Sequence, residues 1–436
     1  MYQDIEERYN KLLDELRNRL ESQDFLERHR SQEGDFSRRR RLSFVMVIFT
    51  LINMLKRALQ DELDELFRLF SEAEVAERCV TKSAFSQARQ KLKHTAFIEL
   101  NQTQVQHFYR HFEHQRWQGH RLLGIDGSLL DVPNQAANRA EFGSWGSRHE
   151  TETAKARISQ LFDVLNGITV DGIIAAKRVG ERLLAQQHLQ QVQAGDLLLL
   201  DRGYPAFWLF LSILACGAHF CARLEVNKWL VAQAFVASGA DTQVVTVPLS
   251  SSSQTVCREH GFDCKAVTLR LVRVDLPTGE VEVLATSLFD LHRYPTSCFA
   301  HLYQQRWPVE EDYKQLKSRL QLENWSGLTP HAVRQDFYAS LFTKNLAAIL
   351  AHPAQQVVAT QTATRKHPYQ VNFTNLLSKL KDTIVLLFSR SDLRPYLSAL
   401  WQQMLQTIEP IRKGRSKPRK FSLRRHRFPI AYKPTR

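Results

Sequence analysis

Apolar positions in the first quarter of the chain repeat at helical spacing. The first repeat consists of leucines three or four residues apart, at Leu12, Leu13, Leu16 and Leu20. This spacing places apolar side chains on one face of a helix. Further helices are expected over residues 42–70, and at 84–92 with Arg89 exposed. Because residues 1–118 contain one glycine and no proline, we expect an all-helical N-terminal domain that can approach DNA.

From Gly119 onward the pattern changes to short apolar runs separated by turn signals. Asn166-Gly167 lies between two such runs and is a strong hairpin signal. The run that ends in four leucines at Leu200 is expected to be a strand at the centre of a sheet. The expected order is extended segments, hairpin, helix, strand and helix, at residues 122–132, 157–175, 181–192, 196–200 and 207–214. This order predicts a mixed α/β sheet.

The rest of the chain divides into segments of distinct composition. Residues 224–290 predict a β-rich insertion, in which residues 250–253 are expected to form a flexible loop. Helical patterns resume at Phe299 and continue to about Leu405. We therefore expect an N-terminal helical domain, a first part of the α/β core, the insertion, a second part of the core, a C-terminal helical region and a tail, at residues 1–118, 119–223, 224–290, 291–350, 351–410 and 411–436.

Positive charge is concentrated in the tail. The chain has 436 residues and a formal net charge of +14. Residues 411–436 hold eleven Lys and Arg residues and no acid, which leaves 48 basic against 45 acidic residues elsewhere. A basic tail on a balanced body predicts attraction to a polyanion, with nucleic acid as the leading candidate. We expect the tail to be disordered until it meets such a partner.

No pattern for export or membrane insertion is visible. The chain opens with charged residues and lacks a cleavable apolar core. The most apolar run, residues 44–55, is too short to span a bilayer and is expected to be a buried helix. Six scattered cysteines fit a reducing compartment better than a disulfide scaffold. We therefore expect a cytoplasmic protein without a membrane partner.

The stretch around residue 310 carries the most informative side chains. In a continuous helix each residue turns by about 100°, which groups four side chains on one narrow face: Tyr303, Arg306, Glu310 and Lys317. One acid among basic and aromatic groups suits a metal ion beside a phosphodiester. Ordinary solvated helices with i,i+3 and i,i+4 charge pairs show the same spacing. Pro308 can break this helix, which would move Tyr303 and Arg306 off the face, or the helix can begin again there.

Two further carboxylates precede this stretch. Asp126 is followed by glycine, and Asp-Gly is also a favoured hairpin turn. Asp201 follows four leucines, where it can make a turn or cap a helix, and where α/β sheets also place their sites. Three converging carboxylates repel one another unless cations lie nearby. Asp126, Asp201 and Glu310 together would suit two divalent ions about 3.5–4 Å apart.

These residues also carry a family resemblance over residues 80–350. The spacing Tyr-x2-Arg-x3-Glu-x6-Lys resembles the signature of bacterial insertion-sequence transposases of the IS-four type, and it is met in full by Tyr303, Arg306, Glu310 and Lys317. The segment from Asp126-Gly-Ser to Pro133 is similar to that family's first aspartate motif. Leu-Asp201-Arg-Gly-Tyr204 is similar to its second.

The resemblance implies an RNase H-like core, a catalytic triad of Asp126, Asp201 and Glu310, and Mg²⁺ dependence. Two Mg²⁺ ions would occupy each active site, and Mn²⁺ can substitute; Asp126 would bind both ions, and the other two acids one each. The implied activity is cut-and-paste movement of a DNA element, with cleavage at its ends and strand transfer into target DNA. The implied partners are double-stranded DNA, as inverted-repeat ends and target, and a second copy of the chain, in a nucleoid-associated homodimer.

Side chains near the three acids are candidates for DNA contact. Tyr303, Arg306 and Lys317 would hold phosphates. Trp307 or Trp325 would stack a displaced base, although tryptophan more often serves packing. Two other functions stay open from the residues alone. One is a catalytically silent DNA-binding protein derived from a transposase, and the other is an RNase H-like nuclease that cuts without joining.

Overall fold

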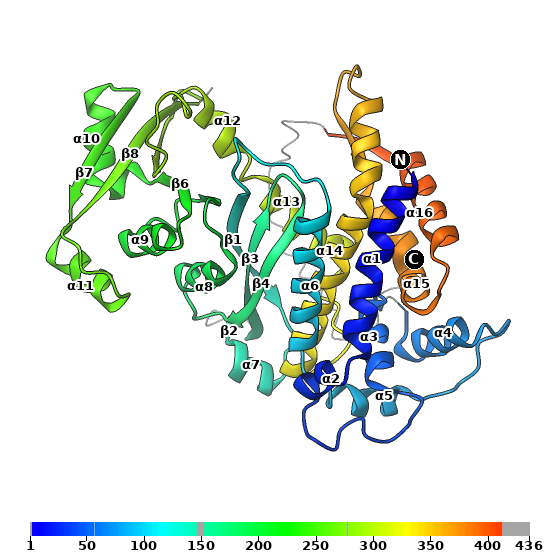
Figure 1. Ribbon diagram of the computed structural model, residues 1–436. Helices are drawn as coiled ribbons and strands as arrows, with labels where there is room; N and C mark the ends of the chain where they lie inside the picture. The colour runs from blue at the N-terminus through cyan, green and yellow to red at the C-terminus, as the bar shows by residue number, and fades with distance from the viewer. Residues whose placement is uncertain (1, 56, 146–151, 277, 412–436) are drawn as a thin grey trace. The chain divides into compact units, whose positions relative to one another are not determined.

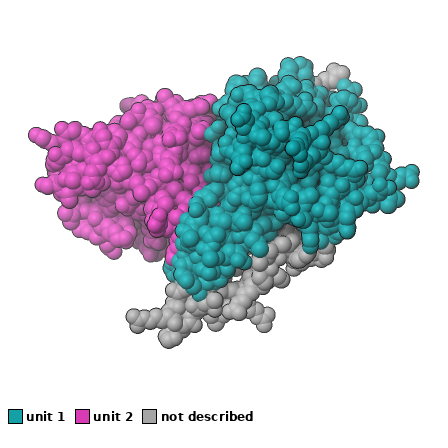
Figure 2. All heavy atoms as spheres, turned by 90° about the horizontal axis from the view of Figure 1, so that it is seen from below, with its two compact units in different colours: residues 1–113, 131–155, 314–436 teal, residues 114–130, 156–313 magenta. Residues whose placement is uncertain are grey.

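The computed structural model describes residues 2–55, 57–145, 152–276 and 278–411. The chain divides into two compact units, coloured separately in Figure 2. The first unit comprises residues 1–113, 131–155 and 314–436, and the second comprises residues 114–130 and 156–313. The six segments expected from the sequence stay a prediction, and residues 412–436 of the expected disordered tail lie outside the described residues.

The first unit is mainly helical (Figure 1). Its α-helices are α1 (Tyr2–Glu21), α2 (Gln23–His29), α3 (Phe44–Ile52), α4 (Leu59–Ser71), α5 (Lys82–Arg89), α6 (Thr95–His111), α7 (Ala136–Phe142), α14 (Pro330–Gln361), α15 (Phe373–Ser389) and α16 (Arg394–Gln406). It also contains the π-helix η3 (Gln315–Arg319) and the short strands β2 (Ser144–Trp145), β10 (Tyr369–Val371) and β11 (Ile408–Pro410). None of the helices in the described ranges is long and apolar enough to cross a membrane.

Helix α14 is the centre of the first unit and contacts α3, α6, α15 and α16. Side chains from other helices bond to its main chain, so they fix its position as well as burying its surface. The Tyr9 hydroxyl donates to the Ile349 carbonyl oxygen at 2.7 Å, and the Trp401 indole donates to the Leu350 carbonyl oxygen at 2.9 Å. The expected buried helix near residue 44 is confirmed as α3, in which seven of nine residues are buried.

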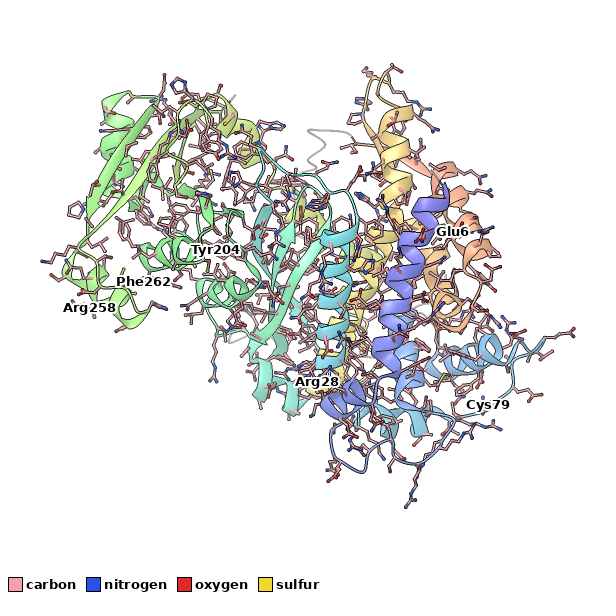
Figure 3. The ribbon with its side chains drawn as sticks, viewed as in Figure 1. Glu6, Arg28, Cys79, Tyr204, Arg258 and Phe262 are labelled. Carbon is pink, nitrogen blue, oxygen red and sulfur yellow. The ribbon has the colours of Figure 1, made fainter. Side chains whose placement is uncertain are left out.

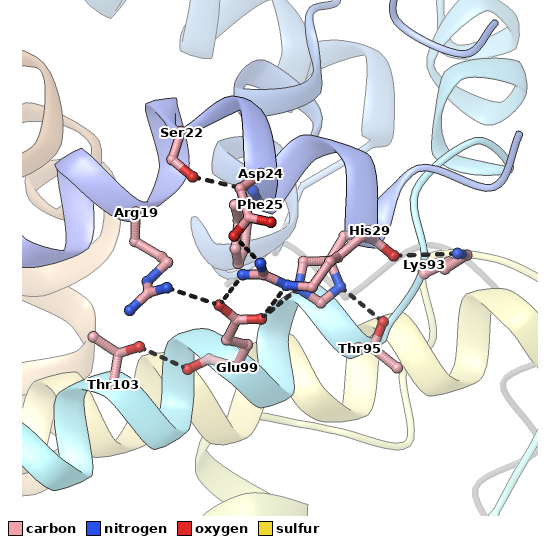
Figure 4. A network of polar contacts seen from close by, with 10 residues as sticks. Arg19, Ser22, Asp24, Phe25, His29, Lys93, Thr95, Glu99 and Thr103 are labelled. Atoms are coloured by element: carbon pink, nitrogen blue, oxygen red, sulfur yellow. Dashed lines mark hydrogen bonds and ion pairs between the residues drawn. The ribbon is translucent and has the colours of Figure 1, made fainter. Parts of the chain in front are cut away.

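Figure 4 shows a polar network that joins α1 and α2 to α6. Its centre is Glu99 on α6. One Glu99 carboxylate oxygen lies 2.6 Å from Arg28 Nη2 and 3.3 Å from Arg19 Nη1, and the other lies 2.9 Å from His29 Nε2. One carboxylate therefore ties two consecutive N-terminal helices to a third helix.

Arg89, expected to be exposed, is instead only 2% exposed, so that part of the prediction was wrong. It is the last residue of α5, which ends before the expected Leu92, and its guanidinium points into the first unit. It donates to Gln335 Oε1 at 2.9 Å, Ser326 Oγ at 2.8 Å and Asp336 Oδ1 at 2.9 Å. A buried arginine is stable only with such a full set of acceptors.

The second unit contains most of a mixed sheet (Figure 1). Its strands are β1 (Leu122–Asp131), β3 (Thr153–Asp163), β4 (Ile168–Ala176), β5 (Leu197–Leu200), β6 (His219–Leu224), β7 (Thr242–Pro248), β8 (Ala266–Asp275) and β9 (Val281–Thr286). Its helices are α8 (Glu181–His188), η1 (Leu189–Gln191), α9 (Phe207–Ala215), η2 (Val226–Lys228), α10 (Leu230–Ser238), α11 (Ser251–Glu259), α12 (Cys298–Gln304) and α13 (Pro308–Lys314).

The core of this sheet runs in the order β4-β3-β1-β5-β6. Strands β3 and β4 form the antiparallel hairpin expected around Asn166-Gly167. Strand β5 pairs in parallel with both β1 and β6. All four residues of β5 are buried, as expected for a central strand. This arrangement confirms the expected α/β class with an RNase H-like mixed sheet.

Two local expectations were wrong, for identifiable reasons. Asp126-Gly127 does not make a turn, because both residues lie inside β1, which continues to Asp131. Residues 250–253 are not a flexible loop: the Ser250 hydroxyl accepts a bond from Ser253 N at 3.2 Å and caps α11. In the β-rich segment, β9 pairs with β6, so its strands extend the core sheet.

The Arg89 contacts predict a large stability cost for their removal. Arg89→Met leaves Asp336 with a largely buried, unpaired charge, so we expect the free energy of unfolding to fall by about 3 kcal/mol. Denaturant unfolding of the full chain would measure this loss. Arg68→Met is the control, because it removes a more exposed helix-surface pair with Glu65 and should cost much less. Equal losses in the two variants would contradict the prediction.

Candidate functional site

Two strands bring the two aspartates together. In the parallel pairing of β1 and β5, Ile125 lies opposite Leu200. Asp126 is the next residue of β1, and Asp201 directly follows the last residue of β5. Since paired strands lie about 4.8 Å apart, the two aspartates follow neighbouring positions at one edge of the sheet. The apolar residues before each aspartate bury the strands, and the carboxylates emerge where that burial ends.

The motif around Glu310 is not one continuous helix. Helix α12 ends at Gln304, residues 305–307 form a turn, and α13 begins at Pro308. The expectation of one helical face was therefore wrong, and the alternative that the helix begins again at the proline is confirmed. Proline suits the first position of a helix because its missing N–H would have no helical partner there.

Helix α13 lies directly against β1. A Cβ atom on Gly124 would lie only 2.5 Å from Val309 Cγ2, so only glycine permits this approach. One turn after Glu310, the Tyr313 hydroxyl donates to the main-chain oxygen of Asp126 at 2.6 Å. The sequence interpretation missed Tyr313. Its signal was its spacing of three residues from Glu310, which places both side chains on neighbouring parts of one helix face.

The broken motif still gathers its side chains. Arg306 Nη2 donates to Glu310 Oε1 at 2.7 Å, and the Arg306 guanidinium carbon lies 6.0 Å from the centre of the Tyr303 ring. The Tyr303 hydroxyl lies 3.4 Å from Asp201 Oδ1. The expectation that a break at Pro308 would separate Tyr303 and Arg306 from Glu310 was therefore wrong. The turn before α13 restores the contact.

The charges of the three acids act on one another. Burial raises the pKa of Asp126 from 3.8 to about 6, and the nearby charges of Glu310 and Asp201 act in the same direction. The bond from Gly127 N and the charge of Arg306 oppose this rise. Negative charge at this edge of the sheet is therefore unfavourable, and a cation would relieve it.

The carboxylate oxygens of the three acids fit a divalent metal ion chemically, although each acid accepts a hydrogen bond from another group in the protein. Carboxylate oxygens are the hard ligands that Mg²⁺ prefers. Within the described ranges, no three Asp, Glu, His or Cys side chains are grouped so that they could hold a metal ion. Glu310 bonds Arg306, Asp126 Oδ1 accepts from Gly127 N at 2.8 Å, and Asp201 Oδ1 accepts from Arg202 N at 2.7 Å. The joint metal-ligand role of the three acids stays a prediction.

Comparison with known proteins identifies the family. The family model described as "Transposase DDE domain" matches residues 117–346, which is more than half of the chain. The chain belongs to this family. The transposase is similar to transposase InsG for insertion sequence element IS4 of Escherichia coli K12, with 24% identity over 91% of this chain and 89% of that relative.

Two further similarities are more limited. A putative transposase y4zB of Sinorhizobium fredii is 26% identical over 37% of this chain and 44% of that relative. A cryo-EM structure of a piggyBac transposase synaptic complex with hairpin DNA gives a TM-score of 0.46 at 11% identity, over 89% of this chain and 84% of that chain. The family match and the IS4 relative confirm a DDE transposase of the IS-four type. Such an enzyme acts on DNA and uses divalent metal, and the two alternative functions are not favoured.

The remaining candidate residues of the transposase have different environments. Trp307 lies in the turn before α13 and is 53% exposed. Trp325 is 3% exposed and donates its indole N–H to the Asp131 carbonyl oxygen at 2.8 Å, so it serves packing and was wrongly considered for base stacking. Lys317 belongs to the first unit and lies in the π-helix. Burial lowers its pKa, while the charges of Glu323 and Asp131 oppose this.

The raised pKa of Asp126 predicts a pH-dependent stability penalty. The folded transposase holds this proton more tightly than the unfolded chain, so stability falls as pH rises from 3.8 to about 6, and the loss is complete above that range. Without divalent ions at pH 7.5, Asp126→Asn should therefore raise the free energy of unfolding by about 1–3 kcal/mol. Denaturant unfolding measures this gain at pH 7.5, where the stability loss is complete, and at pH 4, where little of it has developed. A gain of equal size at pH 4 would contradict the prediction.

Proposed function

We propose that Asp126, Asp201 and Glu310 form the catalytic triad of this transposase and bind two Mg²⁺ ions, for which Mn²⁺ can substitute. The observation that carries the proposal is the parallel register of β1 and β5, which puts both aspartates at one edge of the sheet. The packing of α13 on β1 supports the third member, because Val309 beside Glu310 lies against Gly124. The charges of Asp201 and Glu310 both act on Asp126, so we assign Asp126 to contact with both ions.

The proposed reaction has two chemically similar steps. In the first, water attacks a phosphorus at the element end and loses a proton, while the 3′ oxygen leaves and gains one. In the second, the freed 3′-hydroxyl attacks a phosphorus in target DNA, and one P–O bond breaks there as the new one forms. When bound, the metal ions would activate the attacking oxygen and stabilise the leaving oxygen. The carboxylates of Asp126, Asp201 and Glu310 would hold the ions and so orient the attacking and leaving oxygens.

Neighbouring side chains would position the DNA. Arg306 is 8% exposed, and part of its guanidinium, the Nε atom, has no hydrogen-bond partner within the described residues. We assign it, with Tyr303 and Lys317, to phosphate groups. Trp307, which is exposed beside Arg306, would stack a displaced base. The DNA partners would be the inverted-repeat ends and the target, bound by a homodimer at the nucleoid.

The triad predicts a selective loss of chemistry. Asp126→Asn, Asp201→Asn and Glu310→Gln should each lower the rate of cleavage at cognate DNA ends by about a thousandfold or more. DNA binding, measured by gel shift, should persist, because the neutral variants keep the shape of each side chain. Glu311→Gln is the matched control, since the next residue on α13 is also a glutamate and is exposed. Full activity in any triad variant would remove that residue from the proposed triad.

The basic tail predicts a steep dependence of DNA binding on salt. Each phosphate neutralised by Lys or Arg contributes about −0.9 to the slope of log K against log salt. Changing Lys413, Arg415 and Lys417 to Gln should therefore make the slope less steep, by up to about 3. Fluorescence anisotropy over a salt series measures this slope. The same three-charge change at Arg8, Lys11 and Lys379 is the control, and an equal effect there would contradict a special role for the tail.

A further inference from the structure

A fourth carboxylate lies beside the two catalytic strands. Glu181 is the first residue of α8, and its side chain lies against the glycines that follow each aspartate. A Cβ atom on Gly127 would lie 3.3 Å from Glu181 Oε1, and one on Gly203 would lie 3.8 Å from Glu181 Oε2. The carboxylate therefore lies between the segment after Asp126 and the segment after Asp201.

Arg157 fixes the orientation of this carboxylate. Its Nη1 lies 2.5 Å from Glu181 Oε1, and its Nε donates to the Lys177 carbonyl oxygen at 3.3 Å. Arg182, next to Glu181, donates to the Gly203 carbonyl oxygen at 3.0 Å. One Glu181 oxygen is thus held by the arginine, while the side chain is 40% exposed and its other oxygen lies toward Gly203.

A buried hydroxyl gives an independent sign of a ligand here. Tyr204, labelled in Figure 3, is 2% exposed, and its hydroxyl has no hydrogen-bond partner within the described residues. Burial raises its pKa well above the ordinary value, and the charges of Asp126, Glu181 and Asp201 act in the same direction. The hydroxyl therefore stays protonated, and leaving such a buried donor unpaired costs about 1–3 kcal/mol. An oxygen of a bound ligand would supply the missing acceptor.

The charges of the side chains near Tyr204 indicate which kind of ion would accompany the ligand oxygen. The charges of Asp126, Asp201 and Glu181 all act on the Tyr204 hydroxyl, and the charges of Asp201 and Glu310 act on Asp126. The ion pairs found among them use two arginines: Arg306 with Glu310 and Arg157 with Glu181. The carboxylates outnumber these two arginines by two, and divalent cations would offset this excess of negative charge.

We propose that Glu181 is a fourth metal-site carboxylate of this transposase, positioned by Arg157, and that the Tyr204 hydroxyl donates to an oxygen bound with the cation, from water or phosphate. This inference rests on the proposed function, because it assumes that the metal ions bind beside Asp126 and Asp201. Residues that orient or complete a metal site change affinity by about 10–100-fold when they are mutated.

Glu181→Gln tests the fourth carboxylate, because it keeps the size of the side chain and removes its charge. Calorimetric titration of Mn²⁺ into the full chain without DNA should show about tenfold weaker binding. DNA cleavage should need a correspondingly higher Mn²⁺ concentration and approach its normal rate at saturation. Asp275→Asn is the control, because it removes an ion pair with Arg273 in the same unit and should change neither quantity.

The outcomes separate this inference from the proposed function. Unchanged Mn²⁺ affinity and an unchanged metal requirement in Glu181→Gln would reduce Glu181 to a structural ion pair, whatever the triad variants show. Cleavage that is insensitive to the triad variants would instead overturn the proposed function. If Glu181→Gln does not fold, Glu181→Asp keeps the charge on a shorter side chain, and unchanged affinity in that variant likewise counts against the inference.

Tyr204→Phe tests the source of the bound oxygen while keeping the buried ring. A weaker affinity for Mn²⁺ without DNA would assign the acceptor to water bound with the cation. A loss of cleavage rate with normal Mn²⁺ affinity would assign it to a phosphate of the DNA. Normal metal affinity together with normal cleavage would overturn the role of Tyr204. The unfolding temperature should not fall in either supporting case, because the hydroxyl has no partner among the described side chains.

Discussion

The site depends on one close contact, between Gly124 on β1 and Val309 on α13. A Cβ atom on Gly124 would lie 2.5 Å from the valine side chain, so any other residue would push the helix away from the strand. Glu310 follows Val309, and Asp126 lies two residues after Gly124. The packing of the β1 main chain against the Val309 side chain therefore limits how far apart these two carboxylates can lie. The Tyr313 hydroxyl adds a second fixed point by bonding the Asp126 carbonyl oxygen.

The interruption at Pro308 is compatible with a motif whose spacing suggests one helix. A continuous helix would place Arg306 and Glu310 on one face through its own periodicity. The structure obtains the same pairing across a turn, with Arg306 before the proline and Glu310 in the first turn of α13. The break also leaves Trp307 exposed in the turn. A linear spacing can thus record a three-dimensional contact without specifying the helix that was expected to produce it.

Local signals predicted the parts of the fold that local physics determines. The Asn166-Gly167 hairpin, the buried leucine strand before Asp201 and the helix restart at Pro308 each follow from neighbouring residues. Asp126-Gly127 was uncertain because its turn propensity competes with the place of β1 in the sheet between β3 and β5, which no local pattern reveals. Gly124, Tyr313 and Glu181 matter through partners at Val309, Asp126 and Gly127, far away in sequence. A single sequence gives no measure of such contacts.

The same edge of the sheet concentrates charge that the folded chain does not favour. Burial makes the charge of Asp126 costly, and the guanidinium of Arg306 offsets only part of that cost while it is bound to Glu310. A divalent ion that binds Glu310 must therefore compete with, or share, this arginine. If Arg306 were released from Glu310, it would be free to contact a phosphate, which is negatively charged like the carboxylate. In the proposed function, metal binding and DNA positioning would then be coupled through Arg306, because a metal ion and a DNA phosphate would together replace its bond to Glu310.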